Sequence, residues 1–314
     1  MILFLIQSHR NPAQIGRLVR VLREGCPAAS IVISHDYRSP PLDPAIFRGD
    51  PHVYLTQGQG GRGDFLILDG YLSALRFIRD MGIDYEWLIN LSGSDYPVSS
   101  LRGFAEELQS TRTDGFLHHF DVLKEDPREM APMYWPPGHG RSRYYFQYSK
   151  FKDDLGTVER AALALPRIAM ERYSATYRLN TAYGFLFGKA AARTPFSESF
   201  RCYAGSYWHI VRRRCCDYLV DFSEARADIV GYFRHVLIPD ESFIQTVLVN
   251  NPAFHFVNDN RRYYDMHGSR HGHPKVLTEA EMPKFGSGAY FFARKIEQES
   301  GPHIYEKLDA LALA

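Results

Sequence analysis

The first 120 residues alternate between short apolar runs and segments whose apolar residues repeat at helical spacing. Ile2 to Ile6 is apolar without interruption, as expected of a strand that is covered on both faces. Strands are predicted at Ile2–Ile6, Ser30–His35, Val53–Thr56, Trp87–Leu91 and Asp114–Phe120. Helices are predicted from Asn11-Pro12 onwards, over Phe65–Ile78 and over Leu101–Leu108. Strands separated by helices predict an α/β fold with a mostly parallel central sheet flanked by helices.

Polar residues follow four of the predicted strands at their carboxyl ends. These ends are Gln7-Ser8-His9, His35-Asp36, Thr56-Gln57-Gly58 and Ser92-Gly93-Ser94-Asp95. Ligands of mostly parallel sheets bind outside the carboxyl ends of the strands. Because all of these ends converge on one edge, the sequence predicts a ligand cleft there.

A glycine cluster (Gly58, Gly60, Gly61 and Gly63) lies between the third strand and the next helix. Similar clusters occur in dinucleotide- and phosphate-binding loops. This cluster follows the third strand rather than the first, however, and no Gly-Lys-Ser/Thr ends it. A tight turn that brings the backbone close to a ligand is therefore favoured.

Composition and charge narrow the class of protein. A chain of 314 residues with 45% hydrophobic content buries a sizeable core, and we interpret residues 1–314 as one domain. Lys and Arg (37) balance Asp and Glu (36), which argues against nucleic acid as a partner. The apolar N-terminal run is too short for a signal peptide or a membrane span, so no transmembrane segment is expected. The cysteines have no CxxC spacing, which indicates free thiols and a reducing, cytoplasmic location; they are Cys26, Cys202, Cys215 and Cys216.

The second half of the chain is less regular. Met133–Phe151 mixes proline, glycine, arginine and aromatic residues, which indicates a long insertion over the cleft. Helices are predicted at Val158–Met170, Cys215–Val220 and Ala225–Val236, and strand-like segments at Tyr183–Phe187, Phe254–Asn258 and Ala289–Ile296.

An acidic turn is predicted to open a helix at Pro239. Proline fits the mouth of a helix, and Asp240 and Glu241 follow it in the first turn. The helix is expected to pack on the core through Phe243, Ile244, Val247 and Leu248. It would hold a carboxylate rigidly at an open edge, which is what a general base needs. The alternative is an acidic first turn that only stabilises its helix.

The C-terminal stretch is rich in histidine and in cationic residues. His267, His271 and His273 lack a carboxylate or cysteine partner at the tight spacing of a zinc site, so no metal is expected there. A denser cationic group is formed by Arg262, Arg270, Lys275, Arg294 and Lys295. This group is either a solvated basic surface or an anion site.

Several motifs, in their order along the chain, resemble the core-2/I-branching N-acetylglucosaminyltransferases and the related peptide O-xylosyltransferases, glycosyltransferase family 14. The matching segments are ISHDYRS (Ile33–Ser39), WLINLSGSDYPV (Trp87–Val98), GSYW (Gly205–Trp208), PDESFIQT (Pro239–Thr246) and FFARKI (Phe291–Ile296). The resemblance implies a GT-A-like (Rossmann-like) enzyme with an inserted acceptor-side region. Such an enzyme moves a sugar from a UDP-sugar to a glycan hydroxyl, with inversion and without a divalent metal or other cofactor. Residues 1–122 would bind the nucleotide sugar, and residues 123–314 would bind the acceptor and carry out catalysis.

The resemblance also implies roles for single residues. Glu241 aligns with the catalytic base of the family, Asp36 with an acidic residue that contacts uridine, and Lys295 with a lysine that holds the diphosphate. A second cation at the diphosphate does not align securely. Arg262 and Arg270 are the candidates for it, with His273 as a further one.

The remaining site candidates lie at strand ends and in the insertion. His9 and Asp95 are assigned to the donor side, where Asp95 either positions the donor sugar or fixes its loop. Arg143, Tyr145 and Trp208 are the acceptor-binding candidates, through stacking and hydrogen bonds, although packing explains aromatic residues equally well.

The chemistry of an inverting transfer agrees with these assignments. One carboxylate takes the proton from the attacking hydroxyl, and positive charge from Mg²⁺ or from Arg and Lys stabilises the departing diphosphate. Ser94-Asp95-Tyr96 supplies only one carboxylate instead of an Asp-x-Asp pair. Cations of the C-terminal segment are therefore expected to replace the metal.

The chain departs from the animal members of the family, which have a membrane anchor and several disulfides. Their absence favours a bacterial-type, cytoplasmic enzyme. GlcNAc is the favoured donor sugar, and UDP-xylose is the alternative donor. A metal-dependent transferase and a non-catalytic module that binds nucleotide sugars remain as further alternatives.

Overall fold

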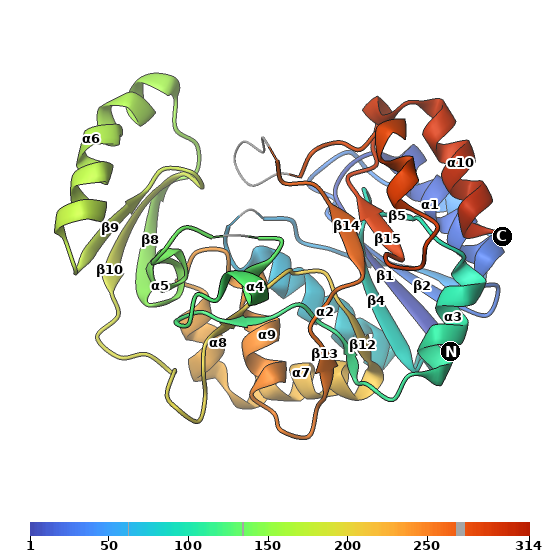
Figure 1. Ribbon diagram of the computed structural model, residues 1–314, viewed down its shortest axis with the longest axis horizontal. Helices are drawn as coiled ribbons and strands as arrows, with labels where there is room; N and C mark the ends of the chain where they lie inside the picture. Colours follow the sequence, from blue (N-terminus) through green and yellow to red (C-terminus); the bar gives the residue numbers. More distant parts are fainter. Residues whose placement is uncertain (62, 134, 268–273) are drawn as a thin grey trace.

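A computed structural model describes residues 1–61, 63–133, 135–267 and 274–314. The described residues form a central seven-stranded sheet (Figure 1). Its strands, from one edge to the other, are β13 (Phe256–Val257), β6 (Gly115–Phe116), β12 (Ile210–Arg212), β4 (Trp87–Ser92), β1 (Ile2–Ser8), β2 (Ser30–His35) and β3 (Val53–Gln57). Only β12 runs antiparallel to its described neighbours, β4 and β6. The predicted α/β class with a mostly parallel central sheet is confirmed.

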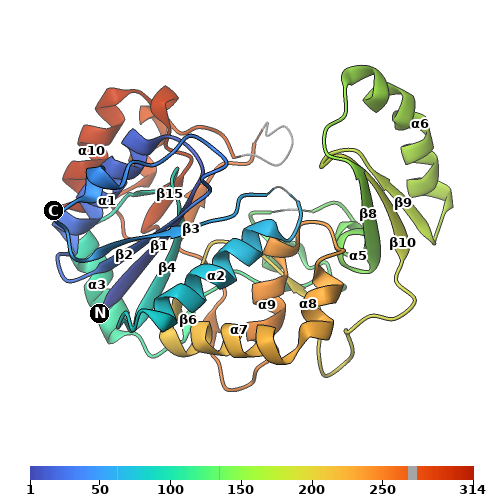
Figure 2. The same ribbon diagram turned by 180° about the vertical axis from the view of Figure 1, so that it is seen from behind.

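Helices cover both faces of this sheet. The helices of the described residues are α1 (Pro12–Gly25), α2 (Leu66–Asp80), α3 (Leu101–Ser110), α4 (Pro127–Met130), α5 (His139–Tyr144), α6 (Thr157–Tyr173), α7 (Arg213–Ala225), α8 (Ala227–Phe233), α9 (Phe243–Val249) and α10 (Pro302–Ala312). Helices α1, α3 and α10 pack on one face, and α2, α7 and α9 on the other (Figures 1 and 2).

The alternation of side chains along β1 explains its unbroken apolar run. Leu3 and Leu5 are buried in the core under α2, α7 and α9, whereas Phe4 and Ile6 are buried in the core under α1, α3 and α10. Successive residues of a strand point to opposite faces, so a strand covered on both sides must be apolar at every position. Within the described residues, no helix has both the length and the apolar character needed to cross a membrane.

The strand predicted at Asp114–Phe120 is wrong in its extent. Two short strands take its place, β6 in the central sheet and β7 (Phe120–Asp121), which pairs with β11 (Tyr203–Ala204). Between them His118 turns its ring inward, with its Nε2 2.9 Å from the Glu129 carbonyl and its Nδ1 accepting from the Ser206 amide. The chain therefore changes sheets within what reads as one apolar segment.

A separate subdomain projects from the second half of the chain, in yellow-green at the upper left of Figure 1. It consists of an antiparallel sheet of β8 (Phe146–Lys152), β10 (Phe185–Ala190) and β9 (Tyr177–Asn180), with α6 packed on β9. A small core under this sheet contains Phe146, Tyr148, Leu186, Leu237 and Ile238. The subdomain lies beside α5 in both views (Figures 1 and 2).

The sequence predicted that the acidic turn at Pro239 is the first turn of the following helix, and this prediction is wrong. Pro239–Glu241 forms a separate 3₁₀ turn, η2, and α9 begins after Ser242. Ile238, just before the turn, has a positive φ of 51°, which bends the chain sharply into it. The four apolar residues predicted to face the core are all buried: Phe243, Ile244, Val247 and Leu248. The packed helix therefore fixes the position of the turn.

The C-terminal segment returns to the sheet edge. There β14 (Arg262–Tyr264), β15 (Phe292–Arg294) and β5 (Tyr96–Pro97) form a small sheet. Shorter 3₁₀ turns are η1 (Pro44–Phe47), η3 (Glu279–Lys284) and η4 (Gln298–Ser300). The cysteines, predicted to be free thiols, are buried and unpaired: Cys26, Cys202, Cys215 and Cys216.

Candidate active site

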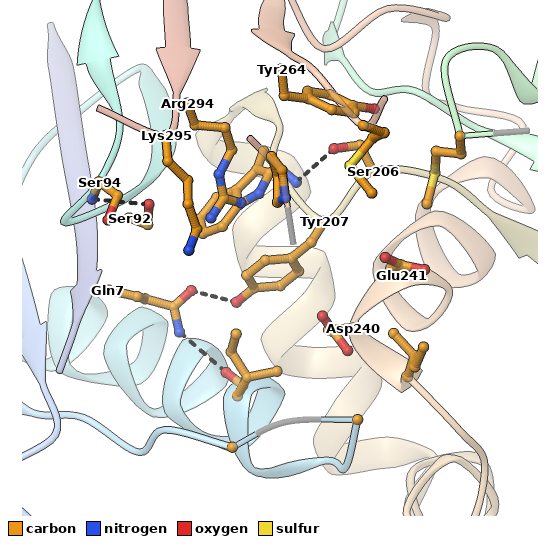
Figure 3. Close-up of a pocket in the computed structure, with 18 of the residues that line it drawn as sticks. Gln7, Ser92, Ser94, Ser206, Tyr207, Asp240, Glu241, Tyr264, Arg294 and Lys295 are labelled. Atoms are coloured by element: carbon orange, nitrogen blue, oxygen red, sulfur yellow. Dashed lines mark hydrogen bonds between the residues drawn. The ribbon is translucent and has the colours of Figure 1, made fainter. Parts of the chain in front are cut away.

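A cavity of about 830 Å³ opens at the carboxyl ends of β1 and β4 (Figure 3). The strand ends contribute Gln7, Ser8, His9, Ser92, Gly93 and Ser94 to its walls. The C-terminal segment contributes Arg294, Lys295 and Glu297, and η2 contributes Asp240 and Glu241. The cavity thus lies at the predicted edge of the sheet, although the ends of β2 and β3 do not line its described part.

The predicted insertion forms another wall of this cavity. Trp135, His139 and Arg143 come from the segment that contains α5, and Tyr183 comes from the loop before β10. Gly61 and Gly63 of the glycine cluster also line the cavity, and Gly63 has a φ of +73°. A side chain on Gly58 would lie 2.8 Å from the Ser34 carbonyl, so the turn passes close to the end of β2.

The base of the cavity includes an aromatic pair that precedes β12. Tyr207 donates a hydrogen bond from its hydroxyl to Gln7 Oε1, and Gln7 Nε2 donates to the Ile67 carbonyl at 3.2 Å. Trp208 stacks between two guanidinium groups, 4.4 Å from Arg294 and 5.4 Å from Arg262. Trp208, predicted to contact the acceptor, therefore lies in the cavity on its cationic side.

Glu241 faces the cavity and is held by an arginine. Arg143 donates from Nη1 to Glu241 Oε2 at 2.6 Å, and its guanidinium lies 4.3 Å from the Trp135 ring. The Glu241 side chain keeps 26% of its exposure, and the Arg143 side chain keeps 13%. Arg143, which the sequence suggested as an acceptor contact, thus also orients the predicted base.

The two adjacent carboxyl groups of η2 have different surroundings. Burial first, and then the charge of Glu241, raise the pKa of Asp240 to about 7. Burial also raises the pKa of Glu241, but the charge and hydrogen bond of Arg143 oppose that rise. Asp240 Oδ1 has no described hydrogen-bond partner. Arg143 contacts Glu241 directly, and its charge therefore favours the ionised form of that carboxyl group.

Cations gather on the opposite wall around one carboxylate. Glu297 accepts from Arg10 at 2.5 Å and from Ser94 Oγ at 3.0 Å, and it lies 3.5 Å from Lys295 Nζ. Burial lowers the pKa of Lys295, and burial likewise lowers that of Arg294. Figure 3 shows Lys295 and Glu241 on either side of Tyr207, with the amine of Lys295 directed toward the cavity.

Asp95 and Arg262 lie behind this wall rather than in the cavity. Both side chains are 0% exposed and form an ion pair of 3.3 Å. Asp95 Oδ2 accepts from both the amide and the hydroxyl of Ser92 at 2.5 Å, and Arg262 Nη2 donates to the Asn90 carbonyl. This geometry favours the loop-fixing role of Asp95 over contact with a sugar. Arg262 does not line the cavity, and its assignment to the diphosphate stays a prediction.

The other predicted site residues are distributed as follows. His9 lines the cavity, and burial lowers its pKa. Asp36 lies outside the wall, where a bidentate contact with Arg38 and a bond from the Gly60 amide hold its pKa well below the usual value. Tyr145 is also outside and packs 5.1 Å from the Phe196 ring. Arg270, His271 and His273 lie outside the described residues.

Asp240, Arg294 and Glu297 line the cavity but had no individual role in the sequence prediction. Asp240 stood next to the assigned Glu241, and Arg294 next to the assigned Lys295, but adjacency does not reveal which side chain faces a cavity. No sequence pattern pointed to Glu297, because its hydrogen-bond partners Arg10 and Ser94 are far from it in the chain. Over residues 1–61, 63–133, 135–267 and 274–314, no group of three or more His, Cys, Asp or Glu side chains is placed to hold a metal ion.

The fold and the cavity define a class: an α/β protein whose strand ends carry a site with carboxyl groups on one wall and cations on another. Residues 161–285 match the model of the Core-2/I-Branching enzyme family. The resemblance indicated by the sequence motifs is thereby confirmed, and this part of the chain is similar to the Core-2/I-Branching enzymes.

Two curated proteins of Arabidopsis thaliana are similar in sequence. Beta-glucuronosyltransferase GlcAT14A is 22% identical over 251 residues, which cover 79% of this chain and 47% of that protein. Beta-glucuronosyltransferase GlcAT14B is 20% identical over 256 residues, which cover 79% and 49%. The chain therefore spans about half the length of these relatives.

Solved structures are similar at a lower level. Mouse xyloside xylosyltransferase 1 has a TM-score of 0.35 and 10% identity, over 96% of this chain and 100% of that one. A nucleoside-diphosphate-sugar pyrophosphorylase from Vibrio cholerae has a TM-score of 0.36 and 10% identity, over 82% and 92%.

Proposed function

We propose that this protein transfers a sugar from a UDP-sugar to a glycan hydroxyl, with inversion and without a metal ion. The observation that carries the proposal is that Glu241 and Lys295 line one cavity, at the carboxyl ends of parallel strands. The family match supports transfer chemistry, and the two plant relatives bear the name glucuronosyltransferase. GlcNAc is our first candidate for the donor sugar, xylose the second, and glucuronate a third that these relatives suggest.

In the proposed reaction, Glu241 takes the proton from the acceptor hydroxyl as it attacks the anomeric carbon. Arg143 orients the Glu241 carboxylate and opposes the rise that burial causes in its pKa. The bond from the anomeric carbon to the diphosphate oxygen breaks on the far side, and the leaving UDP carries the negative charge. Lys295 and Arg294 line the same cavity, and we assign to them the stabilisation of that charge, the role that a cation has in such transfers. Arg294 is thus our candidate for the second cation.

UDP release is expected to continue at an unchanged rate in excess EDTA. The measurement is the initial rate of UDP release from UDP-GlcNAc, UDP-xylose and UDP-glucuronate, each with a panel of oligosaccharide acceptors. Loss of the release in EDTA, with recovery on adding Mg²⁺ or Mn²⁺, would favour the metal-dependent alternative. UDP binding without turnover of any donor would favour the non-catalytic module. The cytoplasmic location remains a prediction.

Arg143→Met is expected to move the acid limb of kcat/KM to higher pH. The Arg143 charge lowers the pKa of Glu241 against the effect of burial, so its removal raises that pKa further. A general base works only when it is deprotonated, and the rate therefore falls at a higher pH than in the wild type. The pH profile of kcat/KM measures this change. Arg141→Met is the matched control, since Arg141 is exposed on the same helix and does not line the cavity. An acid limb of kcat/KM at the same pH as in the wild type would show that Arg143 does not lower the pKa of the base.

A further inference from the structure

A second cavity, of about 620 Å³, adjoins the first one on the side of Arg143. The two cavities share Pro136, His139, Arg143, Tyr183 and Ile238 as wall residues. The remaining walls of the second cavity come mainly from α6, β9 and the loop that follows β9. It therefore lies between the projecting subdomain and α5, one arginine side chain away from Glu241.

The second cavity has a strong excess of positive charge. Arg160, Arg167 and Arg178 line it together with a single carboxylate, that of Glu171. Arg143 also lines it, but Glu241 compensates its charge. The pKa of His139 falls to about 4 through burial and the nearby Arg143, so this histidine is neutral at physiological pH.

Two of the guanidinium groups, those of Arg160 and Arg178, are oriented without being neutralised. Arg160 donates to the carbonyls of Leu155 and Thr181, and Arg178 donates to those of Met170, Ser174 and Tyr177. Within the described part of the chain, neither of them forms an ion pair with a carboxylate. Arg167 lies 3.6 Å from Glu171 and keeps 42% of its side-chain exposure. Backbone carbonyls fix the direction of a guanidinium but leave its charge available, which is the arrangement that suits an anionic ligand.

We propose that this second cavity binds an anionic group of the acceptor glycan, such as a uronate carboxylate or a sulfate. The inference rests on the proposed function, because it assigns the second cavity to the acceptor of that same reaction. Donor diphosphate belongs on the wall of Lys295 and Arg294, and Glu241 stands between that wall and the second cavity. An acceptor that is anchored among the arginines extends past Arg143 to bring its hydroxyl to Glu241. The acceptor is accordingly an acidic oligosaccharide.

Direct binding in the presence of saturating UDP tests the proposal without requiring turnover. The probes are a disaccharide that contains glucuronate, its neutral glucose counterpart and a disaccharide that contains galactose 6-sulfate, each titrated calorimetrically into the full chain. At least one anionic probe is expected to bind about 10-fold more tightly than the neutral one, and added NaCl should reduce the difference. Whether the carboxylate or the sulfate binds better identifies the source of the charge.

Two substitutions on α6 are expected to act in opposite directions. Arg167→Gln should weaken binding of the anionic probe about fivefold, and Glu171→Gln should strengthen it, because one removes an attraction and the other a repulsion. A loss of packing alone would weaken binding in both variants. Arg172→Gln is the matched control, since Arg172 is exposed on the same helix and does not line the cavity.

Three outcomes would overturn the proposal. The first is equal binding of the anionic and neutral probes, and the second is an equal effect of Arg167→Gln and Arg172→Gln. The third is a loss of UDP-glucuronate binding in Arg167→Gln with no change for the disaccharide, which would assign the second cavity to the donor sugar. If UDP itself does not bind, the proposed function fails as well. If UDP binds but the anionic disaccharides bind no more tightly than the neutral one, only the assignment of the second cavity to an anionic acceptor fails.

Discussion

Glu241→Gln is expected to lower the rate of UDP release by at least about 100-fold, because the variant loses the carboxylate that we propose as the general base. Glutamine keeps the size of the side chain, and its amide oxygen still accepts from Arg143. The geometry of the turn is therefore preserved while the basic oxygen is lost. The affinity for UDP should not change, because Lys295 and Arg294, the proposed diphosphate contacts, are unchanged. Initial rates of UDP release and the dissociation constant of UDP are the two measurements.

Comparison variants decide how the Glu241→Gln result is interpreted. Glu159→Gln changes an exposed carboxylate at the start of α6 and should keep the wild-type rate. Asp240→Asn removes the neighbouring carboxyl group, whose pKa burial raises to about 7 and which has no arginine of the described residues bonded to it, and it should cost far less than Glu241→Gln if Glu241 is the base. The reverse order of the two effects would identify Asp240 as the base. A Glu241→Gln variant with full activity would show that Glu241 is not the general base.

Asp95→Asn is expected to destabilise the protein by about 3–5 kcal/mol, the usual cost of breaking a fully buried ion pair. The substitution leaves the guanidinium of Arg262 without its counter-charge at 0% exposure. Burial already lowers the pKa of Arg262 to about 10, and Asp95 is the partner that opposes this effect. Chemical denaturation measures the change in the free energy of unfolding.

The double variant Asp95→Asn/Arg262→Met should recover part of that loss, since no uncompensated charge is then buried. Asp228→Asn is the control, because it removes an exposed pair with Arg226 at the surface. A single Asp95→Asn variant as stable as the wild type would show that the pair does not support the loop after β4. In that case, direct contact with the donor sugar would become the preferred role of Asp95.

Much of the central fold follows from local patterns in the sequence. The strand predicted at Ser30–His35 has the bounds of β2, and the helix predicted from Asn11-Pro12 onwards is α1, which begins at Pro12. These successes arise because periodicity records which faces a segment buries. The same rule failed at Asp114–Phe120, where an apolar segment serves two sheets in turn. A change of partner strand leaves no mark in the spacing of apolar residues.

Predicted site residues that line the cavity come from the motif segments, from a strand end (His9) and from the insertion (Arg143). Glu241, Lys295 and Trp208 lie in motif segments, and all three line the cavity. The pairing of Arg143 with Glu241 joins residues far apart in the chain, and so does that of Asp95 with Arg262. Such pairs depend on how the sheet and the insertion fold back on each other. For Asp36, a local contact with Arg38 two residues away holds the carboxylate outside the cavity wall.

The Glu297 carboxylate balances the positive charge beside Lys295 while the cavity is empty. Arg10, Ser94 and Lys295 surround this carboxylate, so positive side chains that would otherwise repel one another share an internal counter-ion. Under the proposed function, the diphosphate of an arriving nucleotide would compete with Glu297 for Arg10 and Lys295 instead of entering an unbalanced positive field. When the nucleotide leaves, Glu297 would regain these partners. We therefore expect this carboxylate to ease release of the nucleotide.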